Sequence, residues 1–121
     1  MKSIVFCFIC LFAKFSYSQS YNFGALGTVS LAVKCKGNIN ISDKNVIFET
    51  LVNEKKELKE YQLIKKVNNI VYFTDGVMTH YLSFVEKKGT KKGFDYDTWV
   101  VFNSDKSQVG TEPIIYYCKL Q

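Results

Sequence analysis

The stretch that decides the fold is residues 58–86, LKEYQLIKKVNNIVYFTDGVMTHYLSFVE. Three runs rich in β-branched and aromatic residues are separated there by Asn68-Asn69 and by Asp75-Gly76. Both pairs tolerate the positive φ that a two-residue hairpin turn requires. The stretch therefore predicts a meander of three antiparallel strands at 58–67, 70–74 and 77–86. A helix competes only over 54–65, where Glu, Lys and Leu are good helix formers, but the downstream turn favours a strand.

Short β-rich runs separated by turn residues continue on both sides of this meander. Further strands are expected at 29–35, 39–41, 45–52, 96–102 and 114–120. In the first of these runs the odd positions from Val29 to Cys35 are apolar, so we expect the odd positions to face the core. Gly24 and Gly27 indicate a loose entry segment before it. Seven or eight antiparallel strands limit their exposed edges by forming a small barrel or a two-sheet sandwich, so we expect an all-β single-domain antiparallel meander of this kind.

Residues 1–18 have the organisation of a secretory signal peptide. Lys2 gives a positive start, residues 4–12 form an uncharged apolar run, and Ser16 and Ser18 are small residues just before Gln19. A membrane-spanning helix needs about 20 apolar residues, so this run is too short to be one. The sequence therefore predicts a signal peptide at 1–18 and one domain at 19–121, secreted to the periplasm or the extracellular space, with no transmembrane segment.

The charge of the chain is mildly basic and carried entirely by lysine. All 16 basic residues are Lys, against 11 acidic residues. Arginine supplies the bidentate contacts on which specific reading of guanine and phosphate depends. Its absence argues against specific nucleic-acid binding. A general attraction to anionic surfaces remains compatible with the composition.

Two of the four cysteines fall within the expected domain. Cys35 lies near the end of the first strong strand and Cys118 lies in the last strand, which are neighbours if a barrel closes. A disulfide between them is expected to form in an oxidising compartment, and the chain-entropy model assigns such a bridge roughly 4 to 5 kcal/mol. The alternative is that both are unpaired thiols buried as small apolar groups.

His80 is the single histidine and alternates with Met78, Leu82 and Phe84 on the apolar face of its run. The chain contains no nucleophile elbow, no zinc-protease motif and no second histidine for a metal site, so we expect no catalytic residue, no metal and no cofactor. The residues expected to contact a ligand or partner are His80, Tyr81 and Trp99. The competing interpretation is a small secreted hydrolase that uses His80 with Asp95 or Asp97.

Four lysines are concentrated in the segment 87–93. They are Lys87, Lys88, Lys91 and Lys92. One interpretation is contact with an anionic surface, such as lipid head groups, polysaccharide or an acidic partner. The other is a solvated hairpin loop whose charges discourage strand edges from pairing.

These observations predict an exported β-barrel or sandwich that acts as a binding or interaction module and not as an enzyme. The expected partner is a protein, an envelope component or a small apolar ligand. An eight-stranded meander is comparable in architecture to lipocalin-like carriers of small apolar ligands. The Gly-x-Trp signature near the first strand of those carriers is missing here, because Trp99 stands late in the chain.

Overall fold

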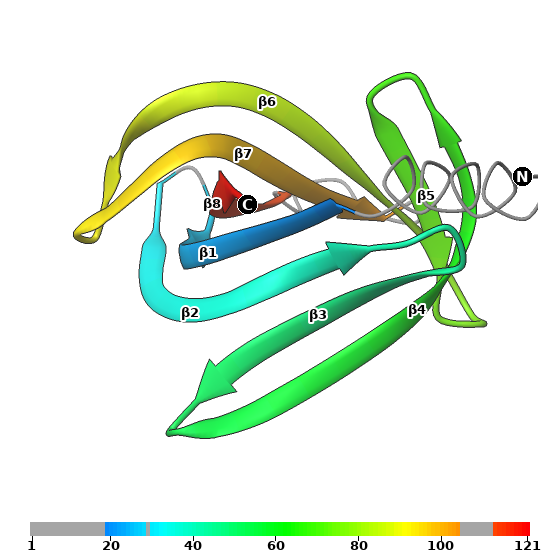
Figure 1. Cartoon of the computed structure of the whole chain (residues 1–121), viewed down its shortest axis with the longest axis horizontal. Coiled ribbons are helices and arrows are strands. Elements are labelled where there is room, and N and C mark those ends of the chain that lie inside the picture. Colours follow the sequence, from blue (N-terminus) through cyan, green and yellow to red (C-terminus); the bar gives the residue numbers. More distant parts are fainter. Residues whose placement is uncertain (1–18, 29, 105–112) are drawn as a thin grey trace, which may run out of the picture.

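The computed structural model describes residues 19–28, 30–104 and 113–121, so the predicted signal peptide at 1–18 lies outside the described residues. The described chain is all-β and forms one antiparallel meander (Figure 1). Its strands are β1 (Gln19–Gly27), β2 (Ala32–Ile41), β3 (Asn45–Val52), β4 (Lys55–Val67), β5 (Ile70–Thr74), β6 (Thr79–Lys91), β7 (Phe94–Ser104) and β8 (Ile114–Leu120). Among the described residues there is no helix long and apolar enough to span a membrane.

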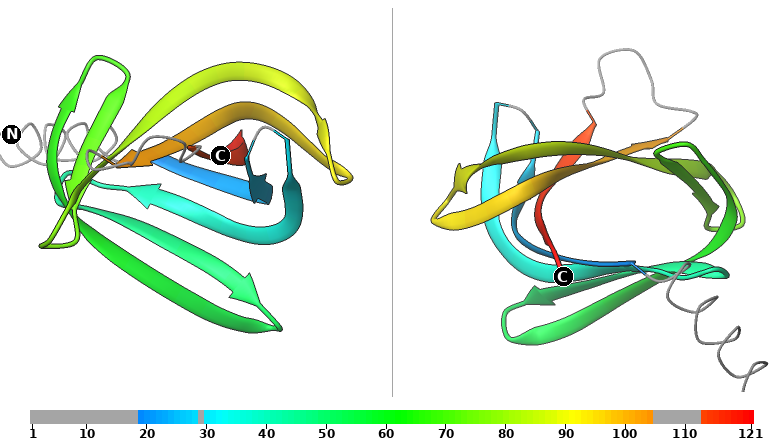
Figure 2. Two further views of the ribbon diagram at one scale, coloured as in Figure 1. Left: turned by 180° about the vertical axis from the view of Figure 1, so that it is seen from behind. Right: turned by 45° about the horizontal axis from the view of Figure 1, so that its top comes forward.

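The eight strands close into a barrel in which each strand pairs with its neighbour in sequence and β8 pairs with β1 (Figure 2). The barrel alternative is therefore the correct one of the two predicted architectures. The predicted meander is confirmed, and the helix alternative at 54–65 is wrong because β4 occupies that segment. The turn at Asn68-Asn69 is confirmed between β4 and β5. The expected turn at Asp75-Gly76 is instead a four-residue connection, 75–78.

β1 is the strand that the sequence did not reveal. Two glycines suggested a loose entry segment, but Tyr21 and Phe23 point into the barrel and are 6% and 2% exposed. A β-bulge between Phe23 and Ala25 then reverses the alternation, so that Ala25 is buried on the outer side of the barrel. Because β1 lies between β8 and β2, the predicted neighbourhood of those two strands is wrong.

β2 also begins later than expected and has the opposite phase at its start. Ala32 is buried, whereas Leu31 and Val33 are exposed, so the odd positions do not face the core there. The reason is the outer cluster that Ala32 joins with Ala25, Ile115 and Tyr117. The strand then continues without a turn through Gly37 and Asn38 to Ile41.

The interior of the barrel is packed with apolar and aromatic side chains. Those that are almost completely buried include Phe23, Ile39, Ile41, Val46, Phe73, Leu82, Val100 and Cys118. Eight strands enclose a space that is just wide enough to be filled by side chains or to hold one small ligand. In this barrel most of the space is filled.

Two hairpins reach beyond the paired ring of strands. β6 and β7 follow a long arc, and β3 and β4 extend away from the barrel (Figure 1). A bulge between Glu86 and Gly89 bends the first hairpin, and the Phe94 ring near its tip lies against Gly24 of β1. The segment at 87–91, expected to be a loop, is therefore strand, and the turn is confined to Lys92-Gly93.

Candidate functional site

The structure has a groove of about 550 Å³ at one mouth of the barrel. One wall comes from the β3–β4 hairpin and the other from β7 and β8. The lining residues are Phe48, Thr50, Glu57, Leu58, Lys59, Tyr61, Phe102, Ile114 and Tyr116. Small-molecule sites in proteins are typically concave and mostly apolar, with a few polar groups, and this groove has that composition.

Aromatic rings form the floor of the groove. The Phe48 ring lies 5.6 Å from Tyr61, 5.9 Å from Phe102 and 5.5 Å from Tyr116, measured between ring centroids. Phe48 and Tyr61 are buried, whereas Phe102 and Tyr116 are half-buried and keep part of their surface in the groove. An apolar molecule in the groove would therefore cover ring surface that now faces solvent.

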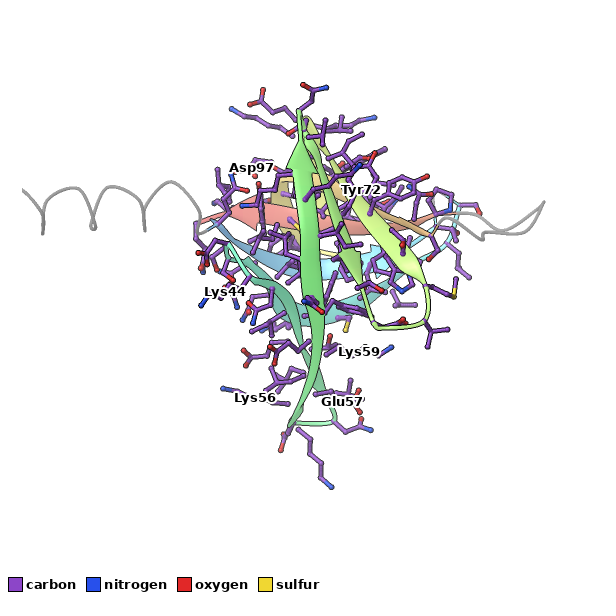
Figure 3. The ribbon with its side chains drawn as sticks, turned by 90° about the vertical axis from the view of Figure 1, so that its right-hand side faces the viewer. Lys44, Lys56, Glu57, Lys59, Tyr72 and Asp97 are labelled. Carbon is purple, nitrogen blue, oxygen red and sulfur yellow. The ribbon has the colours of Figure 1, made fainter. Side chains whose placement is uncertain are left out.

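Polar groups stand around these rings. Cross-strand register places Thr50 opposite Glu57 and Phe48 opposite Lys59, so all four share the inner face of the hairpin. Figure 3 shows Glu57 and Lys59 on one side of β4 and Lys56 on the other. Burial raises the pKa of Tyr116 to about 12, so its hydroxyl keeps its proton at any physiological pH and is available as a neutral donor.

His80 lies beside the groove with a row of polar contacts of its own. Its ring centroid is 5.2 Å from Phe102 and 5.5 Å from Tyr61, and the residue is 7% exposed. His80 Nδ1 is 2.6 Å from Ser104 Oγ, and His80 Nε2 is 3.3 Å from Asp75 Oδ2. The prediction that His80 faces inward with Leu82 is confirmed.

The Asp75 carboxylate determines which ring nitrogen of His80 carries the proton. Asp75 Oδ1 accepts hydrogen bonds from the backbone N–H groups of Met78 and Val77, and these bonds, with that of His80, lower the pKa of Asp75 to about 2. An ionised Asp75 assigns the proton of a neutral His80 to Nε2. Nδ1 then accepts from the Ser104 hydroxyl, so the row can move a proton from a hydroxyl to an imidazole.

The expected partners of a catalytic histidine, Asp95 and Asp97, lie elsewhere. Asp95 accepts a hydrogen bond from the Thr90 hydroxyl, and Asp97 accepts from the Thr98 hydroxyl and from the backbone N–H of Leu120. That part of the hydrolase hypothesis is wrong, because the four-residue connection after β5 brings Asp75 to His80 instead. No group of three or more metal-ligating residues occurs among the residues that the structure describes.

The other two predicted contact residues are not brought to His80. Trp99 and Tyr81 are on the outer face of the barrel, since their strand neighbours Val100 and Leu82 are completely buried inside. Tyr81 lies beside Tyr72, with ring centroids 5.8 Å apart. The three residues therefore do not form one site.

Two of the four clustered lysines are engaged with this outer face. Lys87 Nζ is 4.2 Å from the centroid of the Trp99 ring, and Lys91 Nζ is 5.5 Å from that of Tyr117. Such contacts are favourable because the ring face is electron-rich. Lys88 and Lys92 are exposed and remain the members of the cluster most accessible to an anionic surface.

The predicted disulfide is absent, because Cys35 and Cys118 are both free thiols. The physical reason is the intervening strand β1. Cα atoms on strands two positions apart are separated by about 9 to 10 Å, whereas a disulfide needs about 7 Å or less. The alternative of unpaired thiols is the correct one, and burial raises the pKa of both.

Sequence reasoning did not find the groove itself. Phe48, Tyr61, Phe102 and Tyr116 fall within four of the expected strands, but nothing in the sequence indicates that they converge at one mouth. That convergence depends on the offset between neighbouring strands, which no local pattern encodes. Asp75 was visible only as a turn residue, and its place before a Gly is the single local signal that it organises the connection to His80.

No family model, no curated protein and no solved structure matches the chain, so the groove and the His80 row are interpreted from their own geometry.

Proposed function

We propose that this chain is an exported, non-catalytic binding module that holds a small apolar molecule in the groove at the barrel mouth. The observation that carries the proposal is the convergence of Phe48, Tyr61, Phe102 and Tyr116 on a space of about 550 Å³ in an otherwise filled barrel. Because the interior is filled, an apolar molecule would gain buried surface at this mouth by covering the half-buried rings of Phe102 and Tyr116.

The groove also favours a class of ligand. Its floor is aromatic, which suits a flat or aliphatic molecule, and the hydroxyl groups of Thr50, Tyr61 and Tyr116 suit one uncharged polar substituent. Glu57 and Lys59 at the side have opposite charges, so they give no overall preference for an anion or a cation. The predicted signal peptide implies export, and an exported protein can act as a carrier of this kind.

Equilibrium dialysis with 1-aminoanthracene tests the proposal. The unmodified chain is expected to bind one molecule of this neutral aromatic probe. Ile114→Lys, which places a charge in the groove from its half-exposed wall, is expected to weaken binding by about tenfold or more, because a desolvated ammonium loses its hydration.

A matched control is available on the same strand. Leu120 is 51% exposed and does not line the groove, so Leu120→Lys is expected to bind the probe as the unmodified chain does. If Ile114→Lys retains full affinity, or if both variants lose it equally, the groove is not the binding site and the proposal fails.

Ester or amide hydrolysis is a second candidate function, favoured by the row of Ser104, His80 and Asp75. In such a reaction Ser104 Oγ would form a bond to the acyl carbon, His80 Nδ1 would accept the hydroxyl proton and pass it to the leaving group, and water would release the acid. Hydrolysis of p-nitrophenyl acetate that is lost in Ser104→Ala would support this function. Equal rates for the two proteins would leave binding as the function of this mouth.

A further inference from the structure

The first half of β4 is a strand with a partner on one side only. β4 pairs with β3 from Lys55 to Gln62, but it pairs with β5 only from Gln62 to Val67. Among the described residues, no strand lies against the other edge of 55–61. Residues 55–60 are all exposed, and Leu58 is 67% exposed. An unpaired edge presents backbone donors and acceptors that can pair with another strand.

The backbone groups that face this edge follow from the alternation of the ladder. The N–H of Leu63 donates to the carbonyl oxygen of Lys44, next to β3, so odd-numbered residues of β4 direct their N–H and C=O groups toward β3. The even-numbered residues Lys56, Leu58 and Glu60 therefore direct theirs to the open edge. They provide three donors and three acceptors in a regular strand without a bulge.

The side chains along this edge are complementary to an antiparallel copy of themselves. With a twofold axis at Leu58, Lys56 lies opposite Glu60 of the second copy, and Glu57 lies opposite Lys59 of the second copy. Each of these pairs occurs twice by symmetry. Every charged residue between 56 and 60 then faces the opposite charge, which stabilises directly opposite cross-strand pairs.

Other antiparallel registers bring like charges together. An axis at Lys56 or at Lys59 places that lysine against itself, and an axis at Glu57 or at Glu60 places two glutamates together. The register centred on Leu58 is therefore the one register along 56–60 that places no two like charges opposite each other. It also pairs 55–61 with 55–61, so it covers the open edge from end to end.

The corresponding edge of β6 is built against such pairing. β6 pairs with β5 only through Ser83, so 84–91 also has one open side. That segment contains the bulge between Glu86 and Gly89 and three of the clustered lysines, features by which proteins protect strand edges. β4 has no bulge over 55–61, and Glu57 and Glu60 alternate there with lysines, so its edge is regular and carries both signs of charge.

We infer that two copies of this chain associate through β4, forming one continuous sheet of β3 and β4 from each copy about a twofold axis at Leu58. The interface is isologous, so the same patch serves both copies and the assembly closes at two. Within their own hairpin Lys56 lies 3.3 Å from Glu49, and Glu60 accepts a hydrogen bond of 2.8 Å from Asn45; both partners are on β3, so the dimer pairs would form on the opposite side of β4. Figure 3 shows Lys56, Glu57 and Lys59 on the end of β4 that projects beyond the barrel.

Sedimentation velocity of the purified chain over a range of concentrations tests the inference. The unmodified chain is expected to show a reversible equilibrium between monomer and dimer. Lys59→Glu turns two attractive pairs into repulsive ones and is expected to weaken the dimer by about tenfold or more. The exchanged variant Glu57→Lys/Lys59→Glu restores opposite charges in the same register and is expected to recover the dimer.

Two controls separate this edge from other surfaces. Lys88→Glu, on the exposed part of β6, is expected to leave the dimer unchanged. Leu58→Pro removes a donor that faces the open edge but keeps the ladder to β3, so it is expected to abolish the dimer while circular dichroism still reports a folded barrel. A chain that stays monomeric at the highest concentration, or a dimer that Lys59→Glu does not weaken or the exchanged variant does not restore, overturns the inference.

Discussion

The β3–β4 and β6–β7 hairpins begin alike and end differently. Both close with two residues of positive φ, Asn53-Glu54 in one and Lys92-Gly93 in the other, and both extend beyond the ring of paired strands. The β6–β7 hairpin bends at its bulge and packs on the outer face of the barrel. The β3–β4 hairpin keeps a regular register, leaves 55–60 exposed and leaves one edge of 55–61 without a partner strand among the described residues.

In this barrel the bulge and the small residues, and not the turn, distinguish the hairpin that docks from the hairpin that does not. Gly89 lets the Tyr96 ring lie across its strand, and Gly24 accepts the Phe94 ring. The exposed part of β4, 55–60, has no glycine and no bulge and consists of Leu58 and five charged residues. A hairpin that cannot dock internally keeps its edge for an external partner.

The largest expected effect comes from removing the ring on which the docked hairpin packs. Tyr117 is 2% exposed and lies against Tyr96 and Trp99, so Tyr117→Ala is expected to lower the free energy of unfolding by about 3 to 5 kcal/mol. Leu58→Ala on the undocked hairpin is expected to change it by less than about 0.5 kcal/mol. Urea unfolding measures both, and equal losses would contradict the contrast between the hairpins.

A smaller effect is expected from a single methyl group at Gly24. A Cβ there would overlap the Phe94 ring, so Gly24→Ala must displace the tip of the β6–β7 hairpin. We expect a loss of about 1 to 3 kcal/mol, with faster hydrogen exchange confined to that tip. Unchanged exchange at 89–96 would show that the tip is held by other contacts.

Exchanging lysine for alanine compares the two hairpins at their surfaces. Lys87→Ala removes the cation from the Trp99 ring and is expected to cost about 0.5 to 1 kcal/mol. Lys56→Ala removes only an exposed ion pair with Glu49 and is expected to cost less than about 0.5 kcal/mol. The denaturant midpoint should therefore fall further in Lys87→Ala than in Lys56→Ala. A larger fall in Lys56→Ala would contradict this prediction.

The smallest effect concerns the connection that follows β5. Asp75 has its pKa lowered from 3.8 to about 2 by hydrogen bonds from Met78, Val77 and His80. A carboxylate whose pKa is lower in the folded state than in the unfolded state stabilises the protein at any pH above its unfolded-state pKa. This stabilisation is lost as the pH falls through the folded-state pKa. The stability difference between the parent and Asp75→Asn should be constant above about pH 5, shrink as the pH falls and approach zero only below about pH 2. A difference that persists below pH 2 would show that its charge is not responsible.

The sequence predicted the meander well because its information is local. Alternation and the Asn68-Asn69 turn act within a few residues, and all three expected strands form, although β6 is Thr79–Lys91 and not 77–86. β1 was missed because its bulge after Phe23 breaks the period of two that identifies a strand. That single omission also produced the wrong disulfide, since it removed the strand that separates β8 from β2.

The candidate site was predictable only in its composition. Aromatic residues and His80 were recognised as inward-facing or as contact residues, but their grouping depends on pairings such as His80 with Ser104 and Phe102 with Ile114. These pairings join positions 12 or more residues apart. The alternating charges of 56–60 are present in the sequence. They indicate self-association only once the structure shows that this edge of β4 has no partner strand among the described residues.

Trp99 gives the molecule a built-in optical reporter. It is the sole tryptophan, it lies on the outer side of β7 under Lys87, and its Nε1 is buried without a hydrogen-bond acceptor among the described residues. Its indole therefore senses water and charge at the place where the β6–β7 hairpin docks. The groove opens on the other side of the same wall, so its emission spectrum should shift when the hairpin lifts and stay constant when the groove fills.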